Sequence, residues 1–281
     1  MTKTCRPLAR LAKTMSVTTC RNYSMAAAMH HKPAYGKIAA CAGAVGLAGT
    51  YLVWNQKHVF AEAATTAYAG TVEEPETKIA FPVYLNVDSE WKRLVGLGAR
   101  QVSFLNINVY VVGLYMRNQD METLRTLDGW KVNFDKAEFL EKEELASALL
   151  EQPYDISLRV VPNRATNTQH LRDGFTRSLL TRMREQSKDL TEEEEAEIID
   201  GIRDFKSRFT SANVKKDTEF VFTKTKEGGL KMEFEGKDLG TVNCKWLAIN
   251  FVMGYLNPKA PASEYARQDI AKGFEKLMNE E

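Results

Sequence analysis

The sequence predicts an α+β fold, in which helices pack on one face of a large antiparallel sheet. Three observations lead to this prediction. Alternating and β-branched runs, typical of strands, dominate residues 83–116. Runs with apolar residues at helical spacing come next, followed by a hairpin and further helices. Strands and helices that are segregated along the chain are typical of α+β domains.

Four strands are predicted before the main helices, at residues 83–87, 94–104, 107–116 and 155–161. The second contains Gly96 and Gly98, which indicate a bend or the close approach of another backbone. The third, INVYVVGLYM, is β-branched and aromatic almost throughout, as in strands buried on both faces. Tyr110 and Tyr115 have opposite parity on it, and core packing is the expectation for both.

Helices are predicted at 136–150, from Asn167 to Met183, from Thr191 to Phe209, at 242–256 and from about Ser263 onward. Asn167 is suited to cap its helix, and Thr191 with Glu194 forms a capping box. Between the third and fourth helices, residues 219–224 and 230–235 read as a hairpin that turns at Gly228-Gly229.

The N-terminus differs in composition from the rest of the chain. The first 61 residues contain eight Lys or Arg and no Asp or Glu. A segment rich in Arg, Ser and Thr without acids is typical of a mitochondrial presequence, which we place at 1–23 with cleavage near Tyr23. A disordered basic tail is the alternative. A secretory signal peptide fits less well, because no long apolar core follows directly on the first charges.

Residues 38–54, IAACAGAVGLAGTYLVW, carry no charge. Seventeen residues span about 25 Å as a helix, at the short end of what crosses a bilayer. Basic residues precede the segment, so we predict one inner-membrane anchor with the C-terminal domain in the intermembrane space. A buried globular helix is the alternative. Residues 60–78 would be a linker, and residues 79–281 the folded domain.

Charge excludes one class of partner. Since eight of the 38 basic residues and none of the 37 acidic ones fall in the first 61 positions, the remainder has a balance of −7. An acidic body repels phosphate backbones, so nucleic acid is not expected as a partner. Cys244 is the only cysteine in the expected domain, which excludes an internal disulfide there, and no Cys/His spacing indicates zinc.

Two segments resemble the opening of chalcone isomerase-type domains: LVGLGAR at 94–100 and INVYVVGLY at 107–115. Later segments keep the family's order, including RVVP at 159–162 and HLRDG at 170–174. With its presequence and anchor the chain is similar to the fungal mitochondrial branch, the "altered inheritance of mitochondria" proteins. The resemblance implies an open-faced β-sandwich with a ligand cleft between the large sheet and the helices.

The resemblance also implies site residues. Plant enzymes of the family are intramolecular lyases, in which an arginine on an early strand stabilises developing negative charge, and Arg100 matches it. The family's polar partners align with Leu105, Asn167, Gly174 and Ala248, none of which matches. An arginine without hydrogen-bonded companions organises oxyanion chemistry poorly, so cyclisation of a flavonoid precursor is not expected.

Other relatives implied by the resemblance bind fatty acids, and the fungal mitochondrial members are associated with haem. Both ligands combine an apolar body with carboxylates, which suit the guanidinium of Arg100. A structural ion pair is the alternative for Arg100. His170 is the only histidine after the linker, hence the candidate axial ligand of haem iron, with Met253 and Cys244 as substitutes. A helix cap or surface group is the alternative for His170.

Three functional hypotheses follow. The first is a module that binds a hydrophobic carboxylate, haem or a fatty acid, and the absent catalytic partners favour it. The second is an isomerase of the intramolecular lyase type with an unknown substrate. The third is a membrane-anchored interaction protein with a vestigial cleft.

Overall fold

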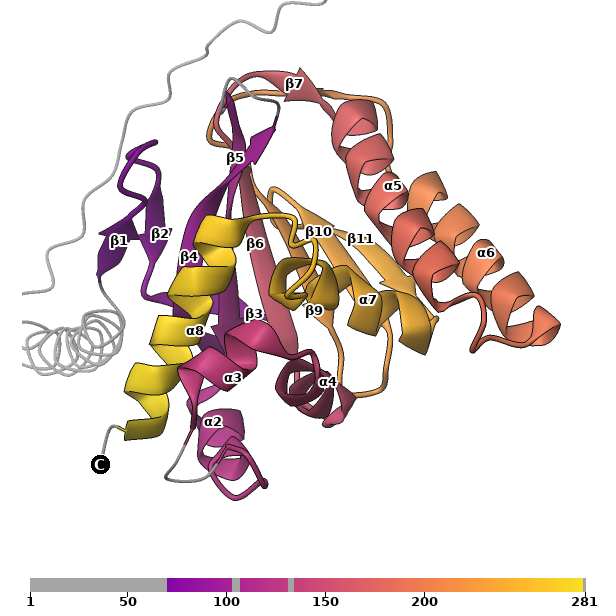
Figure 1. Cartoon of the computed structure of the whole chain (residues 1–281). Coiled ribbons are helices and arrows are strands. Elements are labelled where there is room, and N and C mark those ends of the chain that lie inside the picture. Colours follow the sequence, from indigo (N-terminus) through magenta and orange to yellow (C-terminus); the bar gives the residue numbers. More distant parts are fainter. Residues whose placement is uncertain (1–69, 103–106, 131–133, 280–281) are drawn as a thin grey trace, which may run out of the picture. The chain divides into compact units, whose positions relative to one another are not determined.

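The computed structural model describes residues 70–102, 107–130 and 134–279. The expected presequence and the expected anchor at 38–54 lie outside these residues. Within the described ranges, no helix is both long enough and apolar enough to cross a membrane. The architecture is α+β, as predicted, and is built on a curled antiparallel sheet (Figure 1).

Seven strands form this sheet in the order β11-β10-β9-β6-β5-β4-β3. They are β3 (Tyr84–Val87), β4 (Glu90–Val102), β5 (Ile107–Met116), β6 (Ile156–Pro162), β9 (Phe220–Lys224), β10 (Leu230–Phe234) and β11 (Lys237–Val242). Two short pairs lie outside it: β1 (Thr71–Glu73) with β2 (Ala80–Pro82), and β7 (Thr166–Asn167) with β8 (Asn213–Val214). The helices are α2 (Asn118–Leu124), α3 (Lys136–Glu141), α4 (Glu144–Glu151), α5 (Thr168–Gln186), α6 (Glu192–Ser207), α7 (Lys245–Leu256) and α8 (Glu264–Asn279).

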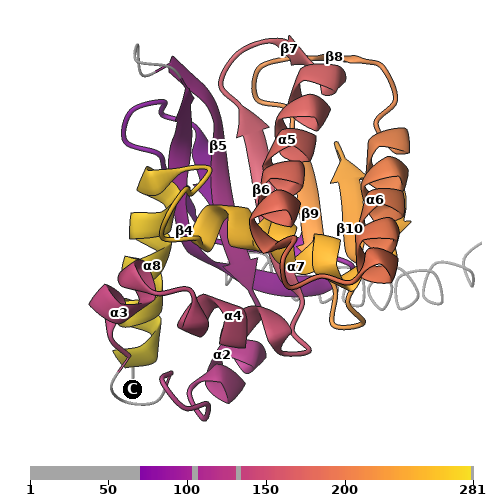
Figure 2. The same cartoon turned by 45° about the vertical axis from the view of Figure 1, so that its right-hand side comes forward.

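Helices α5, α7 and α8 lie against one face of the sheet, and the main core fills the space between (Figures 1 and 2). This core is rich in phenylalanine. Phe222 of β9 and Phe251 of α7, for example, have ring centroids 4.7 Å apart. A smaller cluster occupies the opposite face, where Phe81 of β2 packs with Val111 and Tyr115 of β5.

Helix α8 lies directly on β4, which explains the glycines of that strand. A Cβ atom on Gly98 would come within 2.3 Å of the backbone nitrogen of Ala266. The contact is equally tight from the other side, because a Cβ on Gly273 would lie 1.8 Å from the carbonyl oxygen of Val95. The predicted close backbone approach is therefore confirmed, and side chains are excluded at both positions.

A buried polar row ties β4 to the centre of the sheet. Lys92 donates from Nζ to Ser157 Oγ at 2.9 Å, and Ser157 Oγ lies 2.7 Å from Thr223 Oγ1. All three side chains are buried, and burial lowers the pKa of Lys92. Since a buried ammonium is costly without an acceptor, Ser157 fixes the position of β4 relative to β6.

The structure corrects two of the predicted helices. The helix predicted at 136–150 is two helices, because Lys142 adopts an extended conformation between α3 and α4. The helix predicted to begin at Val242 begins at Lys245, since Val242 pairs with Leu230 as the last residue of β11. The short helix α2 was not expected.

Residues 70–78, which the sequence places in a linker, are folded in the structure. Strand β1 pairs with β2 in antiparallel register, Val72 opposite Phe81. The Glu74 carboxylate accepts bonds from the backbone nitrogens of Glu76 and Thr77, which closes the turn between the two strands.

Candidate functional site

Arg100 lies near the end of β4, directly opposite Tyr110 of β5. Its Nη1 donates to Tyr110 Oη at 3.0 Å, and the guanidinium carbon is 5.6 Å from the centre of the Tyr110 ring. Among the described residues, no carboxylate forms an ion pair with Arg100. The described residues therefore do not support the alternative that Arg100 belongs to a structural ion pair. Next to Arg100, Ser263 Oγ donates to the carbonyl oxygen of Ala99 at 2.7 Å, which fixes this end of β4 to the start of α8.

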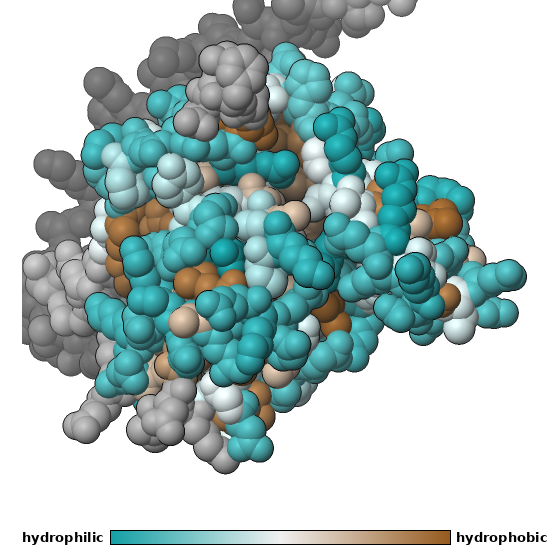
Figure 3. All heavy atoms as spheres, in the orientation of Figure 1, coloured by the Kyte–Doolittle hydropathy of each residue, from teal (hydrophilic) through white to brown (hydrophobic). Residues whose placement is uncertain are grey.

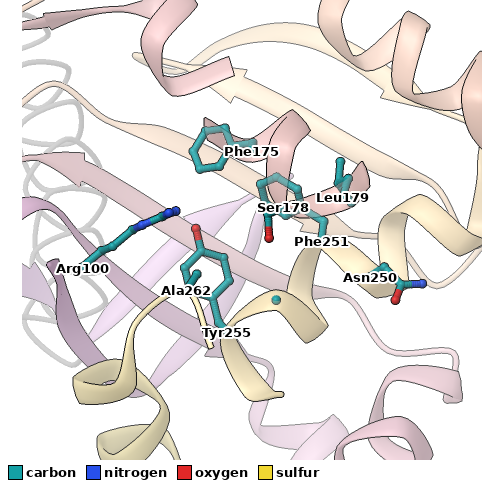
Figure 4. A pocket seen from close by; sticks show the side chains of 9 residues that line it. Arg100, Phe175, Ser178, Leu179, Asn250, Phe251, Tyr255 and Ala262 are labelled. Carbon is teal, nitrogen blue, oxygen red and sulfur yellow. The ribbon is translucent and has the colours of Figure 1, made fainter. Parts of the chain in front are cut away.

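Tyr255 of α7 completes a polar cluster with Arg100 and Tyr110. Its hydroxyl lies 2.7 Å from that of Tyr110. Arg100 and Tyr255 point toward one another from β4 and α7, with the ring of Phe175 near them (Figure 4). Burial raises the pKa of Tyr255 well above its ordinary value, so this phenol keeps its proton at neutral pH.

The hydrogen bonds of this cluster leave donors unused. Arg100 only donates, so Tyr110 Oη accepts from it. The two phenols share one further bond, in which either oxygen is the donor. One phenolic hydrogen therefore has no acceptor within the cluster, and Arg100 has N–H groups in addition to the one on Tyr110. A cation beside a spare hydroxyl donor is suited to bind a carboxylate or another oxyanion.

Apolar cavities meet at this cluster. A narrow inner space of about 10 Å³ is lined by Phe175, Leu179 and Phe251 besides Arg100 and Tyr255, and it has room for about one water molecule. A larger outer cavity of about 370 Å³ lies between β4, β5 and α5. Its lining includes Val102, Val109, Tyr110, Leu171 and Phe175, together with Arg100, Arg164, His170 and Arg177.

In the space-filling view an apolar recess opens near the top of the molecule, with hydrophilic side chains around it (Figure 3). A third hollow of about 330 Å³ adjoins Arg100 on the side of Ser178 and Gly254. Arg100 thus lines all three spaces, and at the inner end of the outer cavity it is next to the apolar side chains of Val109 and Phe175.

The residues that the family resemblance implied lie in different places. His170 and Gly174 line the outer cavity with Arg100. Asn167 caps α5, and its Oδ1 accepts from the backbone nitrogen of His170 at 2.7 Å. Ala248 is fully buried in α7 and lines none of the cavities described here. Leu105 lies outside the described residues.

The imidazole of His170 is in the exposed first turn of α5, so it is at the mouth of the cavity and not in its apolar part. The substitutes Met253 and Cys244 are buried and do not line the Arg100 cavities. Within the described part of the chain, no group of three His, Cys, Asp or Glu side chains could hold a metal ion.

Sequence reasoning missed the two tyrosines of the site. It assigned Tyr110 to core packing, which the burial of Tyr110 confirms, but it did not predict the contact of Tyr110 with Arg100 and did not single out Tyr255. Tyr110 could have been identified from strand register, because it pairs directly with Arg100. That register depends on two irregularities of the β4–β5 ladder, at Leu94/Gly96 and Arg100/Gln101. Arg100 has polar companions after all, but at positions other than those the family pattern implied: Tyr110 on β5, and Tyr255 on α7, the helix that also carries Ala248.

Comparisons with known proteins agree with this fold. The family model described as "Chalcone isomerase like" matches residues 90–271. An uncharacterised protein of Schizosaccharomyces pombe is 30% identical over 194 residues, which cover 66% of this chain and 72% of that protein. "Altered inheritance of mitochondria protein 18, mitochondrial" of Debaryomyces hansenii is 26% identical over 240 residues, 78% of each chain. The same-named protein of Lachancea thermotolerans is 22% identical and covers 88% of this chain and 89% of its own.

Among solved structures, the chain resembles an Arabidopsis thaliana fatty-acid binding protein. The TM-score is 0.59 at 23% identity, and the match covers 75% of this chain and all of the other. Identity at this level shows a shared fold.

Proposed function

The chain belongs to the chalcone isomerase-like family, and we propose that it binds a fatty acid whose carboxylate contacts Arg100. One observation carries the proposal. The guanidinium of Arg100 has no carboxylate partner among the described residues, yet it lies in the wall of an apolar cavity beside a spare phenolic donor. Such an arrangement is suited to an anion attached to an apolar body.

The head of the ligand is recognised by charge and geometry together. The planar fork of an arginine matches the two oxygens of a carboxylate, and a phenol adds a third donor. Nearby Tyr110 raises the pKa of Arg100, so the guanidinium stays charged at every physiological pH. A carboxylate of ordinary pKa is ionised under the same conditions, so both partners carry the charges that this contact needs.

The tail of the ligand would occupy the outer cavity, where Val102, Val109 and Leu171 offer apolar contacts. The inner space is too small for a chain as it stands, because the rings of Phe175 and Phe251 fill it. A long tail would enter only if these rings rotate. The fold shared with a protein described as fatty-acid binding supports this assignment.

Haem is the second candidate, since His170 and Arg100 line one cavity. When bound, haem would supply redox or gas-binding chemistry at its iron, with His170 as the axial donor and arginines for the propionates. The exposed position of His170 is less favourable, because it leaves the iron near solvent. A Soret band in natively purified protein that is lost in His170→Ala would favour haem over a fatty acid.

We also propose that the protein is mitochondrial and anchored in the inner membrane. Homologues named as mitochondrial proteins and the composition of residues 1–61 support the compartment. The charge asymmetry around residues 38–54 supports an orientation with the domain in the intermembrane space. Protease added to mitoplasts should then digest the domain, and intact mitochondria should protect it. Protection in both preparations would place the domain in the matrix.

The ligand proposal is tested by removing the charge from each partner in turn. Oleate and oleyl alcohol have the same tail, but only oleate has a carboxylate. A charge-assisted contact contributes roughly 1.5–3 kcal/mol, so oleate should bind about 10- to 150-fold more tightly than the alcohol. In Arg100→Ala this difference should disappear, and Arg100→Lys should restore part of it.

Arg203→Ala is the matched control, because Arg203 is exposed on α6 and pairs with Asp200. It should keep the preference for oleate. If Arg100→Ala lowers the melting temperature but leaves the preference intact, Arg100 belongs to the scaffold and the proposal is wrong.

A further inference from the structure

The mouth of the outer cavity is positively charged. Arg164, His170 and Arg177 line it, and all three are exposed. None of them forms an ion pair with any residue that the structure describes. The acidic residue in the lining, Asp173, is paired with Arg172 at 2.7 Å and is therefore largely neutralised.

An apolar side chain lies beside these basic residues. Val102, at the end of β4, is 37% exposed, which few large hydrophobic side chains of the described residues reach. It lines the same cavity as the three basic side chains. Guanidinium groups next to an exposed apolar residue are suited to the interface of a bilayer, where charged head groups and acyl chains meet.

This charge differs from that of the chain around it. Beyond residue 61 the chain has a balance of −7, so an anionic surface repels most of the domain. A basic mouth on an acidic body gives the protein a preferred orientation near such a surface. In that orientation the opening of the cavity points toward the anions.

We propose that the mouth formed by Arg164, His170, Arg177 and Val102 docks on the surface of an anionic phospholipid bilayer. The docking rests on these four residues alone. Its purpose rests on the proposed function, because a fatty acid would then pass between the bilayer and the cavity without crossing water.

The expected strength follows from the number of charges. A basic residue near an anionic leaflet raises the affinity about 5-fold, so the two arginines together contribute about 30-fold at low salt. At 1 M salt the Debye length falls to about 3 Å, and the contribution should largely disappear.

The test must distinguish vesicle binding by this mouth from vesicle binding by the basic N-terminus, which we expect to bind anionic vesicles independently. We would use the full chain and label its arginines with phenylglyoxal, a guanidine reagent, and then read each position by mass spectrometry. The vesicles would be phosphatidylcholine with or without phosphatidylglycerol, and free of fatty acid. Arg184 at the other end of α5 and Arg203 on α6 are internal controls, since both are exposed.

Phosphatidylglycerol vesicles should lower the labelling of Arg164 and Arg177 several-fold, reversibly with salt, and leave Arg184 and Arg203 unchanged. The double variant Arg164→Gln/Arg177→Gln should lose about 30-fold in the salt-sensitive part of vesicle affinity. Lys188→Gln/Lys237→Gln removes the same charge from exposed positions outside the mouth and should lose little.

Equal labelling of Arg164 and Arg177 with and without vesicles would overturn the proposal. So would equal protection of all four arginines, which indicates adhesion without orientation. Because the vesicles hold no fatty acid, a negative result would concern the docking surface, whereas loss of the oleate preference concerns the ligand site.

Discussion

Replacing Tyr255 by Phe removes one oxygen atom from the core, and its effect should depend on whether Tyr110 is present. The two hydroxyls are 2.7 Å apart and both rings are buried. In Tyr255→Phe the hydroxyl of Tyr110 keeps Arg100 but loses its other partner. In Tyr110→Phe the hydroxyl of Tyr255 loses the partner that this cluster gives it.

A buried polar group left without a partner costs about 1–3 kcal/mol, so each single variant should lose about that much stability. The double variant Tyr110→Phe/Tyr255→Phe has no orphaned hydroxyl. Its only remaining loss is the acceptor for one N–H of Arg100, which faces the cavity and can bond to water. The stability lost in the double variant should therefore be smaller than the sum of the two single losses, by at least about 1 kcal/mol.

Urea unfolding at neutral pH measures these differences. Tyr115→Phe is the matched control. Tyr115 is on the same strand as Tyr110 but on the opposite face, where its hydroxyl donates to the carbonyl oxygen of Pro82 at 2.8 Å. Its effect should add to that of Tyr255→Phe without coupling. Strict additivity of Tyr110→Phe and Tyr255→Phe would refute the hydrogen-bond accounting on which the ligand site depends.

Three further predictions follow. Gly98→Ala should destabilise the protein severely, because its Cβ would overlap the backbone of α8, whereas Gly174→Ala meets nothing within 4 Å and should stabilise α5 by about 0.5–1 kcal/mol in thermal or urea unfolding. Burial lowers the pKa of Lys92 from 10.5, so the unfolded chain binds more protons between the two pKa values; stability should rise with pH through that window, and Lys92→Met should flatten the rise. The purified protein should not cyclise chalcones, and Arg100-dependent turnover of about 1 per second or faster would contradict this.

The sequence was sufficient for elements with a strong local signal. The strand at 107–116, the Asn167 cap and the Thr191–Glu194 capping box are confirmed as predicted. Helix α2 has only seven residues and its N-cap Arg117 makes no side-chain cap bond, so its position depends on the ion pair of Arg117 with Asp120 and on tertiary packing. Strand β11 is polar, and its position depends on pairing with β10.

The site was less predictable than the fold, for physical reasons. Arg100 was found through a sequence motif, but its partners Tyr110 and Tyr255 can be identified only from the tertiary structure. Helix α7 is apolar around most of its circumference, so no periodicity indicates that Tyr255 is on the face toward Arg100. Tyr110 required the register of two strands whose pairing shifts twice.

The packing of α8 on β4 affects the order in which parts of the protein can fold during synthesis. The strand that carries Arg100 gains its close neighbour only from Glu264–Asn279, the last helix in the described chain. When the polypeptide emerges from a ribosome or a translocation pore, the residues of β4 are available long before those of α8. The face of β4 that carries Gly96 and Gly98 remains uncovered until that helix is made. The close packing of β4 can therefore be completed only after residues 264–279 have been synthesised, so this part of the sheet acquires its native packing late.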